Sequence, residues 1–128
     1  MNVNELNDLS NRIIGAAIEV HRALGPGLLE HTYQVALMRE LELDGIKAES
    51  EVNIPFFYKG KELDTAYRAD IVVEDEIILE LKATENESKL FARQLLTYLR
   101  IAHKRLGLLM NFNQEILRSG ITRVVNGI

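Results

Sequence analysis

Residues 67–83 contain two runs of alternating apolar positions separated by three acidic residues. Apolar and β-branched side chains dominate both runs, and negative charge collects at positions 74–76 between them. This pattern predicts two strands joined by an acidic turn. On the second strand, Glu80 and Lys82 share a face, because side chains two residues apart on a strand point the same way.

The register of this hairpin decides whether Asp70 faces Glu80. With a three-residue loop, Val73 pairs with Ile77 and Asp70 lies directly opposite Glu80 on the same face. A two-residue loop would pair Asp70 with Leu79 and turn Glu80 away, because a slip of one residue moves every side chain to the other face. We predict the three-residue loop.

Asp70, Glu80 and Lys82 then form a candidate catalytic site. Two carboxylates this close raise each other's proton affinity and cost stability unless a cation neutralises them. Lys82 supplies one positive charge, and Mg²⁺ would supply the rest, since it prefers one or two carboxylates with waters and phosphate oxygens. A metal ion lowers the pKa of a bound water, and a neighbouring lysine can orient that water or help to deprotonate it. This is the chemistry of phosphodiester hydrolysis, but an ordinary cross-strand ion pair on a solvated face has the same spacing.

Two helices are predicted before the hairpin. Residues 1–9 are polar and predict a frayed lead-in. An apolar stripe at helical spacing predicts a first helix from about residues 10–11, where Ser or Asn can cap it, to the Gly-Pro-Gly corner at 25–27. A second helix is predicted over residues 28–43, with Leu29 on its apolar stripe. Glu30 in its first turn borders the buried face, where the helix dipole alone can account for an acidic residue.

Strands and a third helix complete the predicted order. Residues 46–58 alternate well enough for a strand, with Pro55 at an edge or a bulge, and residues 59–61 predict a turn into the strand that carries Asp70. These three strands are expected to form an antiparallel meander. Apolar residues after Gly107 and at 121–125 predict two more strands. The order α-α-β-β-β-α-β-β favours a mixed α/β sheet with helices on its faces.

The third helix is expected to run from a cap at Asn86 or Ser88 to about Lys104. Basic side chains follow one of its faces: Lys89, Arg93, Arg100 and Lys104. This basic stripe can bind a phosphate backbone, or it can be an ordinary solvated face. Gln94 can reach the strand end as a hydrogen-bonding residue or lie on plain helix surface.

Composition limits the function classes. The 128 residues fit a single domain spanning 1–128, with 47% apolar and 27% charged residues. The net charge of -4 argues against a general polycation that coats nucleic acid, so any phosphate binding requires a local patch. The absence of cysteine excludes disulfides, thiolate zinc sites and cysteine nucleophiles, and it fits a reducing, cytoplasmic setting. No signal peptide or membrane span is visible.

The combination of these features resembles the PD-(D/E)XK nuclease superfamily, with Asp70 on the second strand and Glu80-x-Lys82 on the third. More closely, residues 27–33, Gly-Leu-Leu-Glu-His-Thr-Tyr, are similar to the signature of the GxxExxY proteins. The other matching segments are Gly25-Pro26-Gly27, Tyr67-Arg68-Ala69-Asp70, Leu79-Glu80-Leu81-Lys82-Ala83, Gln94 with Tyr98-Leu99-Arg100, and Gly107 through Asn111-Phe112. Ala69 stands where the superfamily's name has proline. The resemblance implies a restriction-endonuclease-like core, a central mixed β-sheet flanked by helices.

The resemblance also implies a role for each matching residue. Asp70 and Glu80 would be metal ligands, Glu30 an acidic residue that joins them, Lys82 the residue that positions or activates water, and Gln94 a polar residue near the nucleotide or metal. The implied activity is Mg²⁺-dependent cleavage of DNA, with Mn²⁺ as a substitute, by a possible homodimer. The alternative is a catalytically silent module that keeps the nuclease fold and binds nucleic acid or a protein partner.

Overall fold

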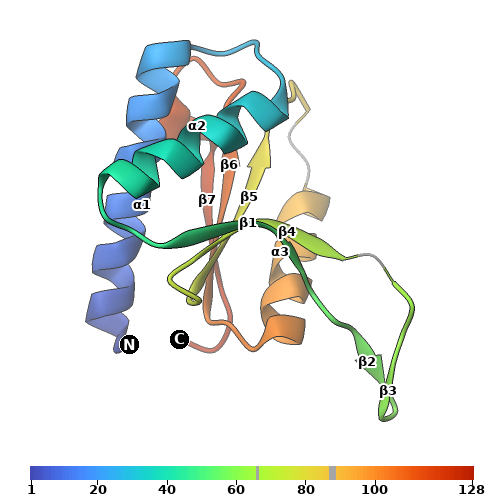
Figure 1. Cartoon of the computed structure of the whole chain (residues 1–128). Helices are drawn as coiled ribbons and strands as arrows, with labels where there is room; N and C mark the ends of the chain where they lie inside the picture. The colour runs from blue at the N-terminus through green and yellow to red at the C-terminus, as the bar shows by residue number, and fades with distance from the viewer. Residues whose placement is uncertain (66, 87–88) are drawn as a thin grey trace.

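The computed structural model describes residues 1–65, 67–86 and 89–128. Five strands form a mixed sheet in the order β1-β4-β5-β6-β7, with helices on both of its faces (Figure 1). The helices are α1 (Val3–Leu24), α2 (Glu30–Leu43), α3 (Lys89–Ala102) and the 3-10 helix η1 (Leu117–Gly120). The strands of the sheet are β1 (Ala48–Asn53), β4 (Arg68–Val73), β5 (Ile77–Lys82), β6 (Leu106–Asn111) and β7 (Ile121–Val125). The predicted mixed α/β architecture is confirmed.

The sheet begins with the predicted meander. β1 pairs antiparallel with β4, and β4 pairs antiparallel with β5. Helix α3 then crosses over, so that β6 runs parallel to β5, and β7 returns antiparallel to β6. Val73 pairs with Ile77, which confirms the three-residue loop and aligns Asp70 with Glu80. The positive φ angles of Glu74 (52°) and Asp75 (55°) make this turn tight.

The two faces of the sheet carry different cores. Helices α1 and α2 cover the larger core, to which β4 and β5 contribute Ile71 and Leu79. Helix α3 covers the smaller one, which consists of Val72, Ile78, Leu95, Leu99 and Leu109, joined by Ile54 and Ala69. Glu80 alternates with Leu79 along β5, so its side chain lies on the α3 side of the sheet.

Helix α1 begins at Val3, so the predicted frayed lead-in at 1–9 and the helix start near residues 10–11 were wrong. Asn2 and Glu5 form a capping box, in which the Glu5 N–H donates to Asn2 Oδ1 at 2.8 Å and the Asn2 N–H donates to Glu5 Oε1 at 3.0 Å. Leu6 and Leu9 extend the apolar stripe toward the N-terminus and are buried.

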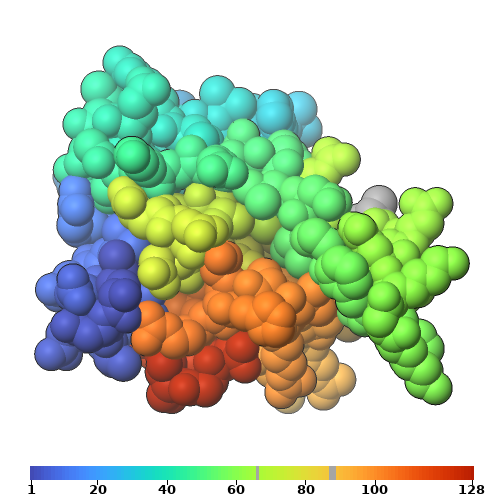
Figure 2. Space-filling view, turned by 60° about the horizontal axis from the view of Figure 1, so that its bottom comes forward, coloured from blue at the N-terminus to red at the C-terminus, as the bar shows by residue number. Residues whose placement is uncertain are grey.

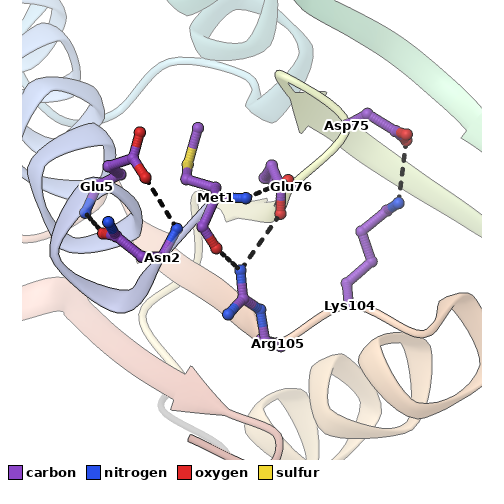
Figure 3. A network of polar contacts seen from close by, with 7 residues as sticks. All are labelled: Met1, Asn2, Glu5, Asp75, Glu76, Lys104 and Arg105. Atoms are coloured by element: carbon purple, nitrogen blue, oxygen red, sulfur yellow. Dashed lines mark hydrogen bonds and ion pairs between the residues drawn. The ribbon is translucent and has the colours of Figure 1, made fainter.

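Further contacts hold the N-terminus against the rest of the chain (Figure 3). Arg105 donates to the Met1 carbonyl oxygen at 2.6 Å and forms an ion pair with Glu76 at 3.8 Å. The Met1 ammonium lies 4.0 Å from the other Glu76 carboxylate oxygen. The start of α1 is therefore linked to the β4–β5 turn and to the residues that follow α3.

The single strand predicted over residues 46–58 is two strands, because the chain breaks at Pro55. A small separate hairpin, β2 (Phe57–Tyr58) and β3 (Lys61–Glu62), stands between β1 and β4. The predicted turn is present: Lys59 and Gly60 have φ angles of 48° and 82°, as a two-residue hairpin loop requires. It leads into β3 and not directly into β4. We call residues 55–65 the arm, because they project from the body of the molecule (Figure 1).

Tyr33 holds the corner between α1 and α2. Its hydroxyl donates to the Gly25 carbonyl oxygen at 2.6 Å and accepts from the Leu28 N–H at 3.1 Å. Its ring is fully buried and stacks on Phe112 with the ring centroids 4.5 Å apart. Leu29, which was expected on the apolar stripe, is instead the residue before α2 and is 79% exposed. The hydroxyl thus fixes where α2 begins.

Replacing Tyr33 by phenylalanine should lower the free energy of unfolding by about 1–2 kcal/mol, because two part-buried hydrogen bonds to the backbone are lost. Urea denaturation at neutral pH measures this change. Tyr58→Phe, which removes a hydroxyl from an exposed ring, is the matched control and should leave stability unchanged. A Tyr33→Phe value within about 0.5 kcal/mol of the wild type would contradict the structural role of the hydroxyl.

Candidate functional site

Asp70 and Glu80 form a pair of carboxylates across β4 and β5. The Leu81 N–H donates to Asp70 Oδ2 at 2.8 Å, and the Asp70 N–H donates to Glu80 Oε1 at 3.3 Å. Each carboxylate therefore accepts a backbone hydrogen bond from the opposite strand, next to the Ile71–Leu79 backbone pair. The two side chains are held together by the register that the hairpin loop sets.

The surroundings of this pair favour a proton on Glu80. Burial first and the Asp70 charge second raise the pKa of Glu80 to about 8. Burial also raises the pKa of Asp70, which is only half-buried. In a hydrogen bond between the two groups, protonated Glu80 donates to Asp70. Since Glu80 is only 9% exposed, the face is not the solvated one that an ordinary surface ion pair requires.

Lys82 lies two residues beyond Glu80 on the same face of β5. Its Nζ is 4.4 Å from the centroid of the Phe91 ring on α3, within the range of a cation–π interaction. Within the described residues, no ion pair joins Lys82 to Asp70 or Glu80, although its charge lowers the pKa of both carboxyls. The lysine is near the carboxylates and remains available to another group.

Glu30 approaches the same end of the sheet from α2. Partial burial raises its pKa; the Lys82 charge opposes this shift, and the charges of Asp70 and Glu51 reinforce it. The first turn of α2 therefore places Glu30 where the charges of Asp70 and Lys82 act on it. Glu30 is the most exposed of the three acidic residues, so it lies at the rim of the site, with Glu80 at the bottom.

Glu51 is a neighbour of the site that the sequence did not indicate. It aligns with Asp70 between the Ser50 and Val52 pairs of the β1–β4 ladder, but its φ angle of 54° is left-handed. Its carboxylate accepts a hydrogen bond from buried Gln34 on α2 at 2.9 Å and lies 3.6 Å from the Arg68 guanidinium. A left-handed residue inside a strand has no sequence signature when it is not glycine. Its charge raises the pKa of Asp70.

Tyr98 on α3 also belongs to the site, although its sequence pattern indicated only a buried stripe. Burial raises its pKa first, and the Glu80 charge raises it next. Its ring meets Tyr67 edge to face at 6.0 Å. Gln94 lies one turn before Tyr98 and three residues after Phe91, so the three share one side of α3. Gln94 is exposed on the helix that borders the carboxylates.

A family model described as the PD-(D/E)XK nuclease superfamily matches residues 7–124. The chain belongs to the PD-(D/E)XK nuclease superfamily. The sheet and its flanking helices are consistent with the restriction-endonuclease-like fold of that superfamily. Comparisons with curated proteins and with solved structures found no match. The narrower resemblance to the GxxExxY proteins stays a prediction. Among the described helices, none is long and apolar enough to cross a membrane.

The donor set of this superfamily member fits a divalent cation. Asp70 and Glu80 offer hard oxygen donors side by side, and burial raises the pKa of both carboxyls, so a cation that neutralises them is favoured. In the described ranges, no group of three or more Asp, Glu or His side chains is arranged to hold an ion. Among these residues Glu30 does not complete a three-ligand set, and a divalent cation held by the pair would fill its other positions with water and phosphate oxygens.

The basic stripe predicted on α3 is shorter than expected. Lys89, Arg93 and Arg100 are exposed on the helix. Lys104 is not part of it, because α3 ends at Ala102 and Lys104 Nζ pairs with Asp75 at 2.9 Å in the β4–β5 turn (Figure 3). Its assignment to the stripe was wrong.

A helix cap was predicted before α3 at Asn86 or Ser88. Of these two residues, Ser88 lies outside the described residues.

Asn111 holds the chain where it leaves β5. Its Nδ2 donates to the Thr84 carbonyl oxygen at 2.8 Å, and its Oδ1 accepts from the N–H groups of Thr84 at 3.3 Å and Asn113 at 3.1 Å. The Phe112 N–H donates to the Lys82 carbonyl oxygen at 2.8 Å. These bonds fix the backbone that carries Lys82.

The raised pKa of Glu80 makes stability depend on pH. The folded chain keeps a proton that the unfolded chain, with an ordinary value of 4.5, gives up. The free energy of unfolding should therefore fall as pH rises from about 4.5 to about 8. Glu80→Gln should remove most of this slope and be more stable than the wild type at pH 9 by up to about 4 kcal/mol.

Urea denaturation between pH 5 and 9 in the presence of a chelator tests this expectation. Glu62→Gln, at an exposed position of β3, is the matched control and should follow the wild-type curve. Parallel curves for the wild type and Glu80→Gln would show that Glu80 is not protonated in the folded state.

Proposed function

We propose that this chain is a Mg²⁺-dependent nuclease that hydrolyses phosphodiester bonds in DNA. The observation that carries the proposal is the Asp70–Glu80 pair, in which each carboxylate accepts a backbone N–H from the facing strand and Glu80 is only 9% exposed. The pair lies beside Lys82 in a member of a nuclease superfamily. A buried like-charge pair is costly in a purely structural role. It is the arrangement expected where a cation and a phosphate complete the site.

Each residue of the site has a proposed role. Asp70 and Glu80 would hold the ion, for which Mn²⁺ can substitute, and Glu30 would join them from α2 when substrate fills the rim. The ion would screen the phosphate charge and lower the pKa of the attacking water. Lys82 would position or activate this water from the same face of β5. Gln94 would bond to a phosphate or nucleotide at the helix surface.

The remaining basic stripe would contact the nucleic-acid backbone. Lys89, Arg93 and Arg100 are exposed on the outside of α3, the helix that covers the site. With a net charge of -4, the chain needs such a local patch to approach a polyanion. Each of these contacts would position the backbone without reading its sequence.

Metal-dependent cleavage tests the roles directly. Asp70→Asn, Glu80→Gln and Lys82→Ala should each lower the rate of DNA cleavage by about a thousandfold, because each removes several kcal/mol of transition-state stabilisation. Gel assays with Mg²⁺ or Mn²⁺ on linear, nicked and branched DNA measure the rate. Glu62→Gln and Lys47→Ala change matched charges at exposed positions outside the site and should cleave normally. Site variants as active as the wild type would refute the assignment.

Calorimetry separates the nuclease from a silent binding module. We expect stoichiometric Mg²⁺ or Mn²⁺ binding to the wild type, strengthened by DNA and abolished in Asp70→Ala. A wild type that binds DNA but neither binds metal nor cuts, with DNA present, would favour a module that keeps the fold and acts by binding alone.

We further propose that the chain acts as a homodimer, since so small a domain has few elements of its own for holding a nucleic acid beside the site. Light scattering should give twice the mass of the 14.5 kDa chain, with or without DNA. A single-chain mass at all concentrations, including in the DNA complex, would contradict this expectation.

A further inference from the structure

The aromatic residues of this chain are concentrated away from its main core. The sequence has four tyrosines, four phenylalanines and no tryptophan. Two of these rings, Tyr33 and Phe112, stack inside the core under α1 and α2. The other six lie in the arm, at its base or on α3: Phe56, Phe57, Tyr58, Tyr67, Phe91 and Tyr98. Large rings dominate cores elsewhere, so this distribution calls for another explanation.

The arm is a well-formed projection. Its base closes where the Ile54 N–H donates to the Tyr67 carbonyl oxygen at 2.9 Å, and the Leu63 N–H donates to the Phe56 carbonyl oxygen at 2.8 Å further along. The arm stands out from the body in the space-filling view, beside the end of the molecule formed by α3 (Figure 2). Tyr58 is 58% exposed near its tip. The projection therefore presents aromatic surface to solvent without helping to build either core.

The two sides of the arm differ in charge. Tyr58 pairs with Lys61, and Phe57 pairs with Glu62, so each pair occupies its own side. Lys59 Nζ lies over the Tyr58 ring at 5.4 Å. One side thus combines an exposed ring with two lysines, and the other combines an equally exposed ring with a carboxylate.

Ring contacts connect the lysine side of the arm to the candidate site. Phe56 lies two residues before Tyr58, on the same side of the hairpin. Its ring is 5.8 Å from that of Tyr67, which in turn is 6.0 Å from that of Tyr98. Tyr98 packs against the α3 core, and the charges of Glu80 and Asp70 act on its hydroxyl, so the inner end of this series reaches the carboxylates. We call Tyr58, Phe56, Tyr67 and Tyr98 the aromatic row.

We propose that the lysine side of the arm and the aromatic row bind a single-stranded stretch of nucleic acid and lead it to the Asp70–Glu80 pair. This inference rests on the proposed nuclease function and assigns its substrate class, a flap, an overhang or a free single strand. Only unpaired bases expose faces that can stack on aromatic rings, whereas a duplex hides them. Lys59 and Lys61 supply phosphate contacts at the point of entry.

The lysines argue against a second copy of this chain as the occupant. Surfaces buried between identical subunits are depleted of lysine, whereas binding to nucleic acid favours lysine beside an exposed ring. The aromatic row also leads to the candidate site. This favours a ligand that must reach that site over a second copy of the chain. A contact between two copies would not require rings that continue from Tyr58 inward to Tyr98.

Fluorescence anisotropy with the full chain tests the proposal. The probes are a labelled oligothymidylate of about 20 nucleotides and a blunt duplex of the same length, with Ca²⁺ in place of Mg²⁺. Tyr58→Ala should weaken binding of the single strand about tenfold, as loss of a stacking partner does. Phe57→Ala, an equally exposed ring on the other side of the arm, should change it less than about twofold.

The contribution of Lys59 and Lys61 to binding is measured separately, from the salt dependence of Kd. The double variant Lys59→Ala, Lys61→Ala should reduce the slope of log Kd against log salt by about 1.4, the value for two contacts to a single strand. Lys47→Ala, which removes an exposed lysine at the other end of the sheet, should leave the slope nearly unchanged. Circular dichroism and thermal unfolding confirm that each variant is folded.

The outcomes distinguish this proposal from the nuclease function. Equal single-strand affinity for Tyr58→Ala and the wild type, or equal dependence on Tyr58 for the blunt duplex, would overturn the role of the arm even if the wild type cleaves DNA. A loss of dimer in Tyr58→Ala, without a change in oligonucleotide affinity, would assign the arm to contacts between copies. Arm-dependent binding of the single strand without cleavage under any metal would support the arm and overturn the nuclease function.

Discussion

The buried pair of Asp70 and Glu80 is the constraint on which the rest of this structure depends. Two carboxylates in contact on a covered sheet face repel each other and resist ionisation. They remain together because the β4–β5 register aligns them and a backbone N–H from the facing strand bonds to each. Among the described residues, the larger core under α1 and α2 contains no buried pair of carboxylates. The larger core thus lies on one face of the sheet, and the carboxylate pair lies on the other face with the smaller core.

The elements around the pair can be understood from this separation. Helix α2 is anchored by the Tyr33 hydroxyl and brings its first turn to the end of the sheet, while α3 covers the carboxylates and presents Phe91 to Lys82. The crossover through α3 makes β6 parallel to β5, and Asn111 at the end of β6 fixes the chain as it leaves the site. Contacts remote from the carboxylates therefore determine how the charged groups approach one another.

Sequence patterns predicted the parts of this arrangement that depend on local periodicity. The acidic residues at 74–76 between two apolar runs located the hairpin, and the three-residue loop chosen over a two-residue one gave the Asp70–Glu80 pairing. The start of α1 was missed because polar residues there hide a capping box and two buried leucines. Lys104 was misplaced because helical spacing alone does not show where α3 ends. The left-handed backbone of Glu51 has no signature in the pattern of residue types.

Glu51 has a further consequence at the margin of the sheet. β1 is an edge strand, and a regular edge offers a template on which another chain can pair and aggregate. The left-handed turn at Glu51 interrupts the extended backbone in the middle of β1, and Glu49 places a second negative charge nearby. An incoming strand would find neither a continuous row of hydrogen-bonding groups nor a neutral surface. The residue that borders the candidate site thus also protects the β1 edge of the sheet.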